Sequence, residues 1–433
     1  MTTPNRTDLQ AAWLALSTNG LPPDPELAAR VLPEWSVGIS GWIDQIAEQF
    51  LQGYCRERSH YKLVIAPYGG GKSHFLLAMR QRALEEHFAV SYLRCSADTR
   101  IDNWSSLFPE IASSIHLPGE WQPGLSGVID AAMDTIRKRA SATDDPEATI
   151  DFILASIRNS TRYASPIFSR LVAIILSDRH LNNDADRANA ANIWLSHGQN
   201  MVSKAQRAQL GVQNIPAAQT GRHGEQLFHS LVRFLKEFVG MHGLVLLLDE
   251  TDMMFNTRGR AMARLMAALR TLIDQADDAL GPIPVLGMLA AVPNIDEQLQ
   301  QYAALQQRFS DVIPFEEGAV NAPRINLAKC MKDHMFLVLL GEKLLHLSEN
   351  AFGRTYDADI QRQNIELLSK VACSRMTDID SRRLFVKTWC AVLDQQAGQG
   401  NRQLAAEEAA NLLQGVTQSF HQAQPVTQQE DIG

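Results

Sequence analysis

Between an apolar run at 63–65 and a helical pattern at 74–79 lies the sequence Ala66-Pro67-Tyr68-Gly69-Gly70-Gly71-Lys72-Ser73. A strand, a glycine-rich loop ending in Gly-Lys-Ser and a helix, in this order, are typical of a phosphate-binding loop. The glycines let backbone N–H groups turn onto the β- and γ-phosphates, Lys72 reaches the same oxygens, and Ser73 offers its hydroxyl to Mg²⁺. The dipole of the following helix, from His74 onward, adds to this attraction. We therefore expect residues 67–74 to bind ATP with Mg²⁺.

Ala66 departs from this pattern, because the loop usually opens with glycine. The first turn must then have a backbone conformation that alanine can adopt. The alternative interpretation is an ordinary glycine-rich turn between a strand and a helix, but strand, loop, Gly-Lys-Ser and helix all occur in order.

A second motif lies far downstream, where the apolar run Leu244-Val245-Leu246-Leu247-Leu248 ends in Asp249-Glu250. Such a run is typical of a buried parallel strand. With the loop it predicts a Walker A and Walker B pair, in which Asp249 holds Mg²⁺ and Glu250 polarises the attacking water. An apolar strand ending in an acid is common by itself, but a kinase would need no such glutamate.

Length and composition indicate a globular protein of two or three domains. The chain has 433 residues, of which 45% are hydrophobic, enough for a substantial core. No stretch has the roughly 20 apolar residues of a membrane span, and the first ten residues do not have a signal pattern, so we expect a cytoplasmic protein without membrane contact. The five cysteines show no metal-binding spacing and are expected to be reduced core residues.

The charge of the chain leaves nucleic-acid binding open. The formal net charge is −8, whereas a protein that follows a phosphate backbone usually carries a basic face. Basic groups at 137–139 and at Arg258 and Arg260 are more typical of solvated helix faces. DNA therefore stays a possible partner only, for example in a ring in which several subunits contribute small basic patches.

The long separation of the two motifs predicts a large insertion into an α/β core, because one βαβ unit needs only about 30 residues. Apolar positions recur at helical spacing around 129–136, 150–157 and 167–176, with polar breaks at 141–146 and 160–165. The predicted organisation is an N-terminal helical segment (1–60), the first core part (61–117), a helical insertion (118–224), the second core part (225–323), a C-terminal helical lid from Arg324 to residue 395, and a loose helix with a disordered tail (396–433).

Several residues at the predicted strand ends are further site candidates. The run 90–95 predicts a second core strand with Asp98 beyond its end, although Asp98 also suits a turn. A helix at 259–277 leads to a buried strand at 285–292, after which Asn294 could contact the γ-phosphate or simply form a Pro-Asn turn. Next, Arg308 precedes a strand-like segment at 312–315 and lies where it could reach the nucleotide of a neighbouring subunit.

The last candidate is an arginine at a helix start in the C-terminal lid. The sequence Asp380-Ser381-Arg382-Arg383 predicts the beginning of a helix, from which an arginine could fold back onto the phosphates. An ordinary surface pair is the alternative. The sequence does not distinguish Arg382 from Arg383 for this contact.

Together, these motifs resemble an AAA+-type P-loop ATPase of the initiator and helicase-loader kind, with an α/β core, a parallel sheet and a helical lid. More narrowly, the chain resembles the ATP-binding proteins of bacteriophage-exclusion (BREX) defence systems, of the BrxC and BrxD type. The stretches that carry this resemblance are Tyr68–Leu76, Ile193–Gly198, Leu244–Asp252 and Gln301–Phe309.

The resemblance implies functional roles and partners. Arg308 corresponds to an arginine-finger box and Arg382 to a second sensor, while Val292-Pro293-Asn294 departs from the usual Thr-Pro or Thr-Asn pair. It also implies ATP hydrolysis by a homo-oligomer in anti-phage defence, with helicase or methyltransferase components as protein partners and DNA as a possible substrate. The alternative is a nucleotide-dependent scaffold or helicase-loader-like regulator with little hydrolysis. A small-molecule kinase is disfavoured, since the sequence contains no acceptor-site motif.

Overall fold

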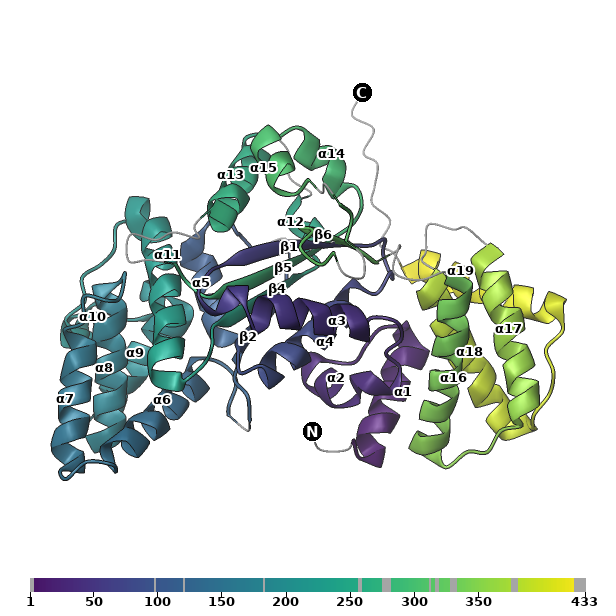
Figure 1. The fold of residues 1–433 in the computed structure, drawn as a ribbon, viewed down its shortest axis with the longest axis horizontal. Coiled ribbons are helices and arrows are strands. Elements are labelled where there is room, and N and C mark those ends of the chain that lie inside the picture. Colours follow the sequence, from purple (N-terminus) through teal and green to yellow (C-terminus); the bar gives the residue numbers. More distant parts are fainter. Residues whose placement is uncertain are drawn as a thin grey trace. The chain divides into compact units, whose positions relative to one another are not determined.

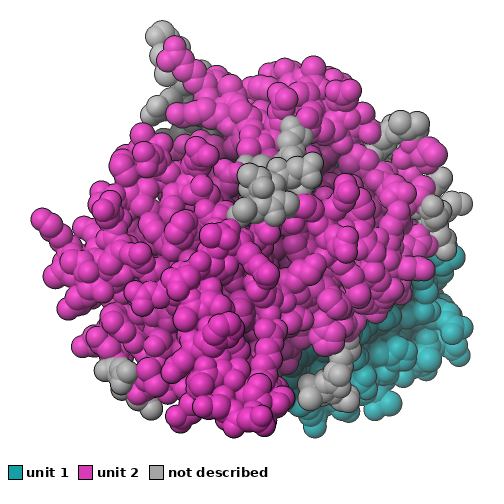
Figure 2. Space-filling view, turned by 60° about the vertical axis from the view of Figure 1, so that its left-hand side comes forward, with its two compact units in different colours: residues 1–41, 65–78, 326–433 teal, residues 42–64, 79–325 magenta. Residues whose placement is uncertain are grey.

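The computed structural model describes residues 4–96, 99–119, 121–181, 184–255, 259–274, 282–310, 313–315, 319–327, 333–374 and 381–423. The chain forms two compact units, which Figure 2 shows in different colours. Unit 1 comprises residues 1–41, 65–78 and 326–433, and unit 2 comprises residues 42–64 and 79–325. Both units are therefore assembled from segments that are distant in the sequence.

A six-stranded sheet forms the centre of unit 2, with the strand order β3-β2-β4-β5-β1-β6. Strand β4 pairs in parallel with both β2 and β5, whereas β3 is antiparallel to β2. The strands are β1 (His60–Ile65), β2 (Ala89–Arg94), β3 (Ile115–His116), β4 (Leu244–Asp249), β5 (Val285–Ala291) and β6 (Arg324–Asn326). The expected α/β class with a mostly parallel sheet is confirmed for the strands β2, β4 and β5.

The two central strands are buried along their whole length. All residues of β4 and β5 are buried, as expected for near-continuous apolar runs covered on both faces. A methyl group on Gly287 of β5 would lie only 2.1 Å from Cδ1 of Tyr61 in β1. Glycine at this position therefore lets the tyrosine ring lie directly over the neighbouring backbone.

The residues between β3 and β4 are helical, as the sequence predicts. Figure 1 shows α7, α8 and α9 side by side, and α5 packs against both α9 and α11. Asp145 accepts a hydrogen bond from the first turn of α7, and Oγ of Ser165 accepts one from the Phe168 N–H in the first turn of α8, so each polar break in the sequence contains a helix cap. The helices between β3 and β4 are α6 (Leu125–Ala140), α7 (Pro146–Arg158), α8 (Pro166–Leu181), α9 (Ala185–His197), α10 (Lys204–Leu210) and α11 (Ala217–Phe234), and α5 (Trp104–Ser113) lies just before β3.

The remaining helices of unit 2 lie before β1 and around β5. They are α3 (Ser40–Ile46), which begins at the unit boundary, α12 (Asp252–Phe255), α13 (Arg260–Asp274), α14 (Ile295–Gln300) and α15 (Ala303–Arg308). Helix α13 corresponds to the helix predicted at 259–277, whose last residues lie outside the described ranges. Asp98, Arg258 and Asp380 also lie outside these ranges.

Unit 1 joins the two ends of the chain. Helix α1 packs against α16 and α18, and α19 packs against α17 and α18. The helices are α1 (Arg6–Asn19), α2 (Pro25–Val31), α16 (Asp333–Phe352), α17 (Ala358–Ser374), α18 (Ser381–Gln399) and α19 (Ala406–Ala423). The glycine-rich loop and the first half of α4 (Lys72–Glu85) also belong to this unit.

The structure differs from two local predictions. The segment predicted to be strand-like is not a strand at 313–315, where Pro314 has no N–H group to donate, and Val312 lies outside the described ranges. The short strand β6 occurs instead at Arg324–Asn326, where the sequence analysis expected a helical lid to begin.

The end of the chain forms more structure than the loose helix expected there. Helix α18 extends to Gln399, and Ala409 and Leu413 of α19 are fully buried. Apolar residues at helical spacing within a segment rich in glutamine and alanine explain this packing.

Among the described residues, no helix is both long enough and apolar enough to cross a membrane.

Candidate functional site

The glycine-rich loop connects β1 to α4, and each glycine has a separate structural reason. Gly69 and Gly71 have φ angles of 84° and 89°, which favour glycine. Position 70 has no room for a side chain, because a Cβ there would lie 2.7 Å from Cβ of Ala66 and 3.0 Å from the Pro67 carbonyl oxygen. The loop thus forms a tight cradle in which all three positions favour glycine.

Ala66 takes a conformation that suits alanine, as the sequence analysis required. Among the described residues, only His87 and Glu250 combine a side chain with a positive φ. The buried methyl group of Ala66 occupies the space in front of Gly70. The alanine is therefore compatible with the loop as long as Gly70 has no Cβ.

Lys72 closes the loop onto its own beginning. Its side chain is buried, and Nζ donates hydrogen bonds to the carbonyl oxygens of Ala66 (2.9 Å) and Pro67 (3.1 Å). The Nζ atom also lies 5.3 Å from the centroid of the Tyr68 ring, which is 61% exposed. A cation in contact with loop carbonyl oxygens is positioned to meet an anion bound by the same loop.

The residues after Lys72 lie in the first turn of α4, where the positive end of the helix dipole is located. Ser73 is partly exposed there. His74 forms a 2.8 Å hydrogen bond with Oγ of Ser36, and burial lowers its pKa to about 4. The His74 ring is therefore neutral at pH 7 and helps to hold α4 against the N-terminal segment of unit 1.

Arg382, the second residue of α18, lies against the loop. Its Nη1 donates a 3.0 Å hydrogen bond to the Gly70 carbonyl oxygen, and Nη2 donates to the Leu327 carbonyl oxygen at 3.3 Å. The guanidinium carbon lies 4.5 Å from the centroid of the Phe336 ring. These contacts place a buried positive charge beside the glycines.

Arg383, the neighbouring arginine, has a different environment. Its Nε donates a 3.0 Å hydrogen bond to the Asn19 carbonyl oxygen at the end of α1. Of the two arginines that the sequence could not distinguish, Arg382 is the one that donates a hydrogen bond to the loop among the described residues.

In unit 2, Asp249 is fully buried at the end of β4. Its Oδ2 accepts a 2.6 Å hydrogen bond from the Tyr92 hydroxyl, and Oδ1 accepts a 2.9 Å hydrogen bond from the backbone N–H of Glu250. Burial and the nearby Asp249 raise the pKa of Tyr92, so its hydroxyl stays protonated and donates. Both carboxylate oxygens are thus held in a fixed orientation and keep lone pairs for another ligand.

Glu250 has an unusual backbone, with a φ of 54°. A non-glycine residue in this region costs about 1–2 kcal/mol. Its side chain is 51% exposed, and Oε1 lies 3.8 Å from Nε of Arg94. An exposed ion pair of this length contributes little energy, so it does not account for the strained backbone.

The other two candidates lie on separate elements of unit 2. Asn294 is exposed and precedes α14, three residues after β5 ends. Arg308 ends α15, and its Nη1 donates a 2.7 Å hydrogen bond to the Ala304 carbonyl oxygen in its own helix. Their predicted roles stay predictions.

The candidates therefore form two groups. In unit 1, residues 67–74 lie together with Arg382, and in unit 2, Asp249 and Glu250 lie together with Tyr92 and Arg94. The last two residues were not predicted from the sequence. Arg94 is opposite Asp249 in the parallel register of β2 and β4, so aligning the ends of the two predicted strands would have drawn attention to it.

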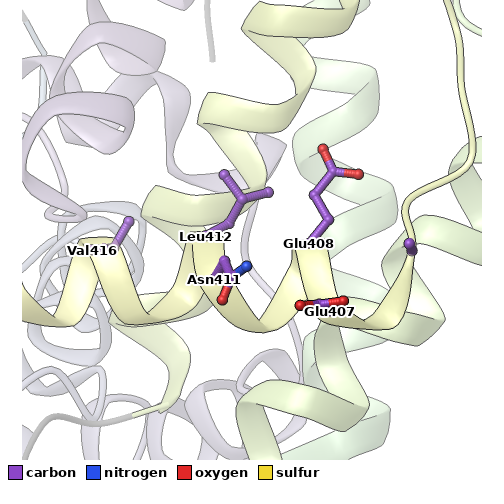
Figure 3. A pocket seen from close by; sticks show the side chains of 7 residues that line it. Glu407, Glu408, Asn411, Leu412 and Val416 are labelled. Atoms are coloured by element: carbon purple, nitrogen blue, oxygen red, sulfur yellow. The ribbon is translucent and has the colours of Figure 1, made fainter.

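An open hollow of about 620 Å³ lies along α19 (Figure 3). It is lined by one helix and the residue before it, including Glu407, Glu408 and Val416. It contains none of the predicted site residues.

Comparison with known proteins identifies a family. The model of the family described as BREX system ATP-binding protein BrxC/D matches residues 28–410. No curated protein and no solved structure gives a significant match. The family match confirms the resemblance found in the sequence.

Proposed function

The chain belongs to the BREX system ATP-binding protein family BrxC/D, and from this premise we propose that it is a Mg²⁺-dependent ATPase that acts as a motor or switch in phage defence. The family description supports ATP binding and a place in the BREX system. Hydrolysis, oligomerisation and the individual residue roles are the proposed part.

The loop has the features that a triphosphate needs. The crowded Gly70, the buried cation of Lys72 and the start of α4 together offer backbone donors and positive charge. In the proposal, residues 67–74 bind the phosphates, and Arg382 contacts them from α18. Positioning and charge stabilisation carry most of phosphoryl transfer, so in this proposal the same contacts serve both binding and the reaction.

The two acidic residues at the end of β4, Asp249 in the strand and Glu250 directly after it, have complementary properties. Asp249 offers an oriented carboxylate, a ligand type that Mg²⁺ prefers, and Ser73 would be the hydroxyl ligand. Glu250, with its half-exposed carboxylate, would polarise the attacking water. The strained backbone at Glu250 is the observation that most favours hydrolysis over simple binding, because such strain is typically retained at functional sites.

The proposal extends to Arg382 and can be tested against Arg383. Arg382→Ala is expected to weaken ATP binding about tenfold or more, because a hydrogen bond to a charged group contributes about 1.5–3 kcal/mol. Arg383→Ala, the matched control, also loses a hydrogen bond to a backbone carbonyl but should bind ATP like the wild type. Calorimetric titration of both variants with ATP makes this comparison. Equal affinities would remove Arg382 from the site.

The oligomeric part of the proposal predicts turnover that depends on protein concentration. An arginine supplied by a neighbouring subunit can raise the rate by several orders of magnitude, so ATP turnover per subunit should rise as the protein assembles. Arg308→Ala should abolish this rise while leaving ATP affinity nearly unchanged. The measurement is a concentration series with and without single- and double-stranded DNA, using Lys72→Ala as the blank.

Two outcomes of this series would contradict the proposal in different ways. Equal turnover of assembled wild type and Arg308→Ala would exclude the role in trans. Flat turnover near the blank, with ATP firmly bound, would favour a nucleotide-dependent scaffold. A response to DNA would support DNA as a partner, and the helicase or methyltransferase components of the defence system stay proposed protein partners.

A further inference from the structure

A partly enclosed cavity of about 130 Å³ lies in unit 2 between α5, α9 and α11. Its apolar wall includes Trp104, Phe108 and Leu227, and Trp194 contributes a largely buried indole. A cavity of about 150 Å³ is large enough for benzene. At about 130 Å³, this space is slightly smaller and of the order of one flat ring, and it is continuous with a further hollow described below. Trp194 belongs to a stretch that the proposed ATPase site does not use.

Two buried polar atoms in this wall are unsatisfied within the described residues. They are Nε1 of Trp194 and Nε2 of His223, whose rings meet edge to face at a centroid distance of 5.9 Å. Burial lowers the pKa of His223, so that its ring is neutral at pH 7. Nε1 can only donate, whereas neutral Nε2 can accept or donate. A ligand with both acceptor and donor atoms along one edge would satisfy both.

A second, more open hollow of about 630 Å³ adjoins the cavity, since Ile215 and His223 line both. The amide side chains of Gln213, Asn214, Gln219 and Gln226 and the exposed Arg222 line this hollow. No aspartate or glutamate is among the lining residues of either space. Amides can bond sugar hydroxyls, and an arginine without a neighbouring acid in the hollow suits a phosphate group.

We propose that this part of the helical insertion binds a nucleotide unit, with the base in the cavity between α5, α9 and α11 and the phosphate at Arg222. A nucleobase is planar and carries donors and acceptors along one edge. An aromatic side chain fits the cavity less well, because a phenyl ring has no polar edge for Trp194 and His223. The nucleotide unit can be a free mononucleotide or an unpaired nucleotide of a single strand. This site is separate from the loop at 66–73.

The test uses the full chain with Lys72→Ala, which weakens binding at the loop. Calorimetric titration with adenosine, adenosine monophosphate and thymidine monophosphate should show binding at millimolar concentration or below, tighter for the monophosphates. Arg222→Ala should lower the monophosphate affinity about tenfold and leave adenosine binding unchanged. Arg158→Ala, an exposed arginine at the end of α7, is the matched control and should change neither.

Two further variants test the cavity itself. Thr220→Phe places a ring at the cavity wall and should reduce binding of every probe at least tenfold. Trp194→Phe removes only the indole donor and a small volume, and should weaken base binding several-fold even if Thr220→Phe does not fold. Short oligothymidylate and oligoadenylate strands distinguish the sources: much tighter binding than the monophosphates indicates a single strand, and similar binding indicates a free nucleotide.

Three results would overturn the proposal. The first is that no probe binds to a folded Lys72→Ala protein, which would leave water as the partner of the two buried nitrogens. The second is that binding is insensitive to both cavity variants. The third is that N-acetyltryptophanamide binds better than the nucleotides, which would assign the cavity to an aromatic side chain. None of these results bears on ATP turnover at the proposed ATPase site.

Discussion

Replacing Lys72 with alanine is expected to lower ATP affinity on the order of 100-fold and to abolish turnover. The ammonium group is buried and lies 2.9 Å and 3.1 Å from two loop carbonyl oxygens, so its positive charge lies directly at the loop. Charge-assisted hydrogen bonds to phosphate oxygens are about twice as strong as neutral ones. Titration of the variant with ATP in the presence of Mg²⁺ measures the loss directly.

A second lysine of unit 1 provides the matched control for this variant. Lys387 is partly exposed on α18, and its Nζ donates a 3.4 Å hydrogen bond to Oγ of Ser419 on α19, so Lys387→Ala removes a cation of the same type from another element. It should bind ATP like the wild type. Because Lys72→Ala also leaves two carbonyl oxygens without their donor, its thermal unfolding must be recorded alongside. A variant that is folded and still binds ATP normally would show that the loop does not carry the nucleotide.

The loop was predictable because its requirements are local. Positive φ angles at Gly69 and Gly71 and the absence of space at Gly70 follow from a short connection between one strand and the next helix. The strands β4 and β5 were equally recognisable, since each is a continuous apolar run up to its last residues. These features depend on residues that are adjacent in the sequence, so they can be recognised from one sequence alone.

The partners of the site residues depend on tertiary packing and were not predictable in the same way. Tyr92 reaches Asp249 only because β2 is the sheet neighbour of β4. Arg382 rather than Arg383 faces the loop because adjacent residues on a helix point about 100° apart, and the sequence does not show which direction faces the loop. The sequence also gave no sign that Glu250 has a φ of 54°.

The pairing of the edge strand β6 also depends on tertiary packing and was not predictable from the sequence. The segments 312–315 and 324–326 are both short and partly apolar, and of the described residues in them, Arg324–Asn326 pair with the sheet whereas 313–315 do not. The segment 324–326 is held at the sheet edge by backbone hydrogen bonds. The Leu63 N–H, for example, donates to the Pro323 carbonyl oxygen at 2.8 Å. Side-chain patterns therefore predict the central strands better than the edge strand.

Glu250→Gln is expected to reduce ATP turnover by roughly 100-fold or more, the lower limit for loss of a group that handles a proton in the transition state. ATP affinity should stay within a few-fold of the wild type. Glutamine has the same size, so the buried Asp249 and its bond from the backbone N–H of residue 250 are retained. Single-turnover hydrolysis and ATP binding, measured on the same preparation, separate the two effects.

Glu297→Gln is a suitable control, because Glu297 is an exposed residue in the first turn of α14 and the same charge is removed. Its turnover should equal that of the wild type. If Glu250→Gln also hydrolyses ATP at the wild-type rate, Glu250 does not polarise the water, and this result favours the scaffold, in which bound ATP determines the conformation of the chain. If turnover is lost while ATP stays bound, the strain at Glu250 is best explained by its place in catalysis, since a scaffold has no use for an exposed carboxylate held in a conformation that costs about 1–2 kcal/mol.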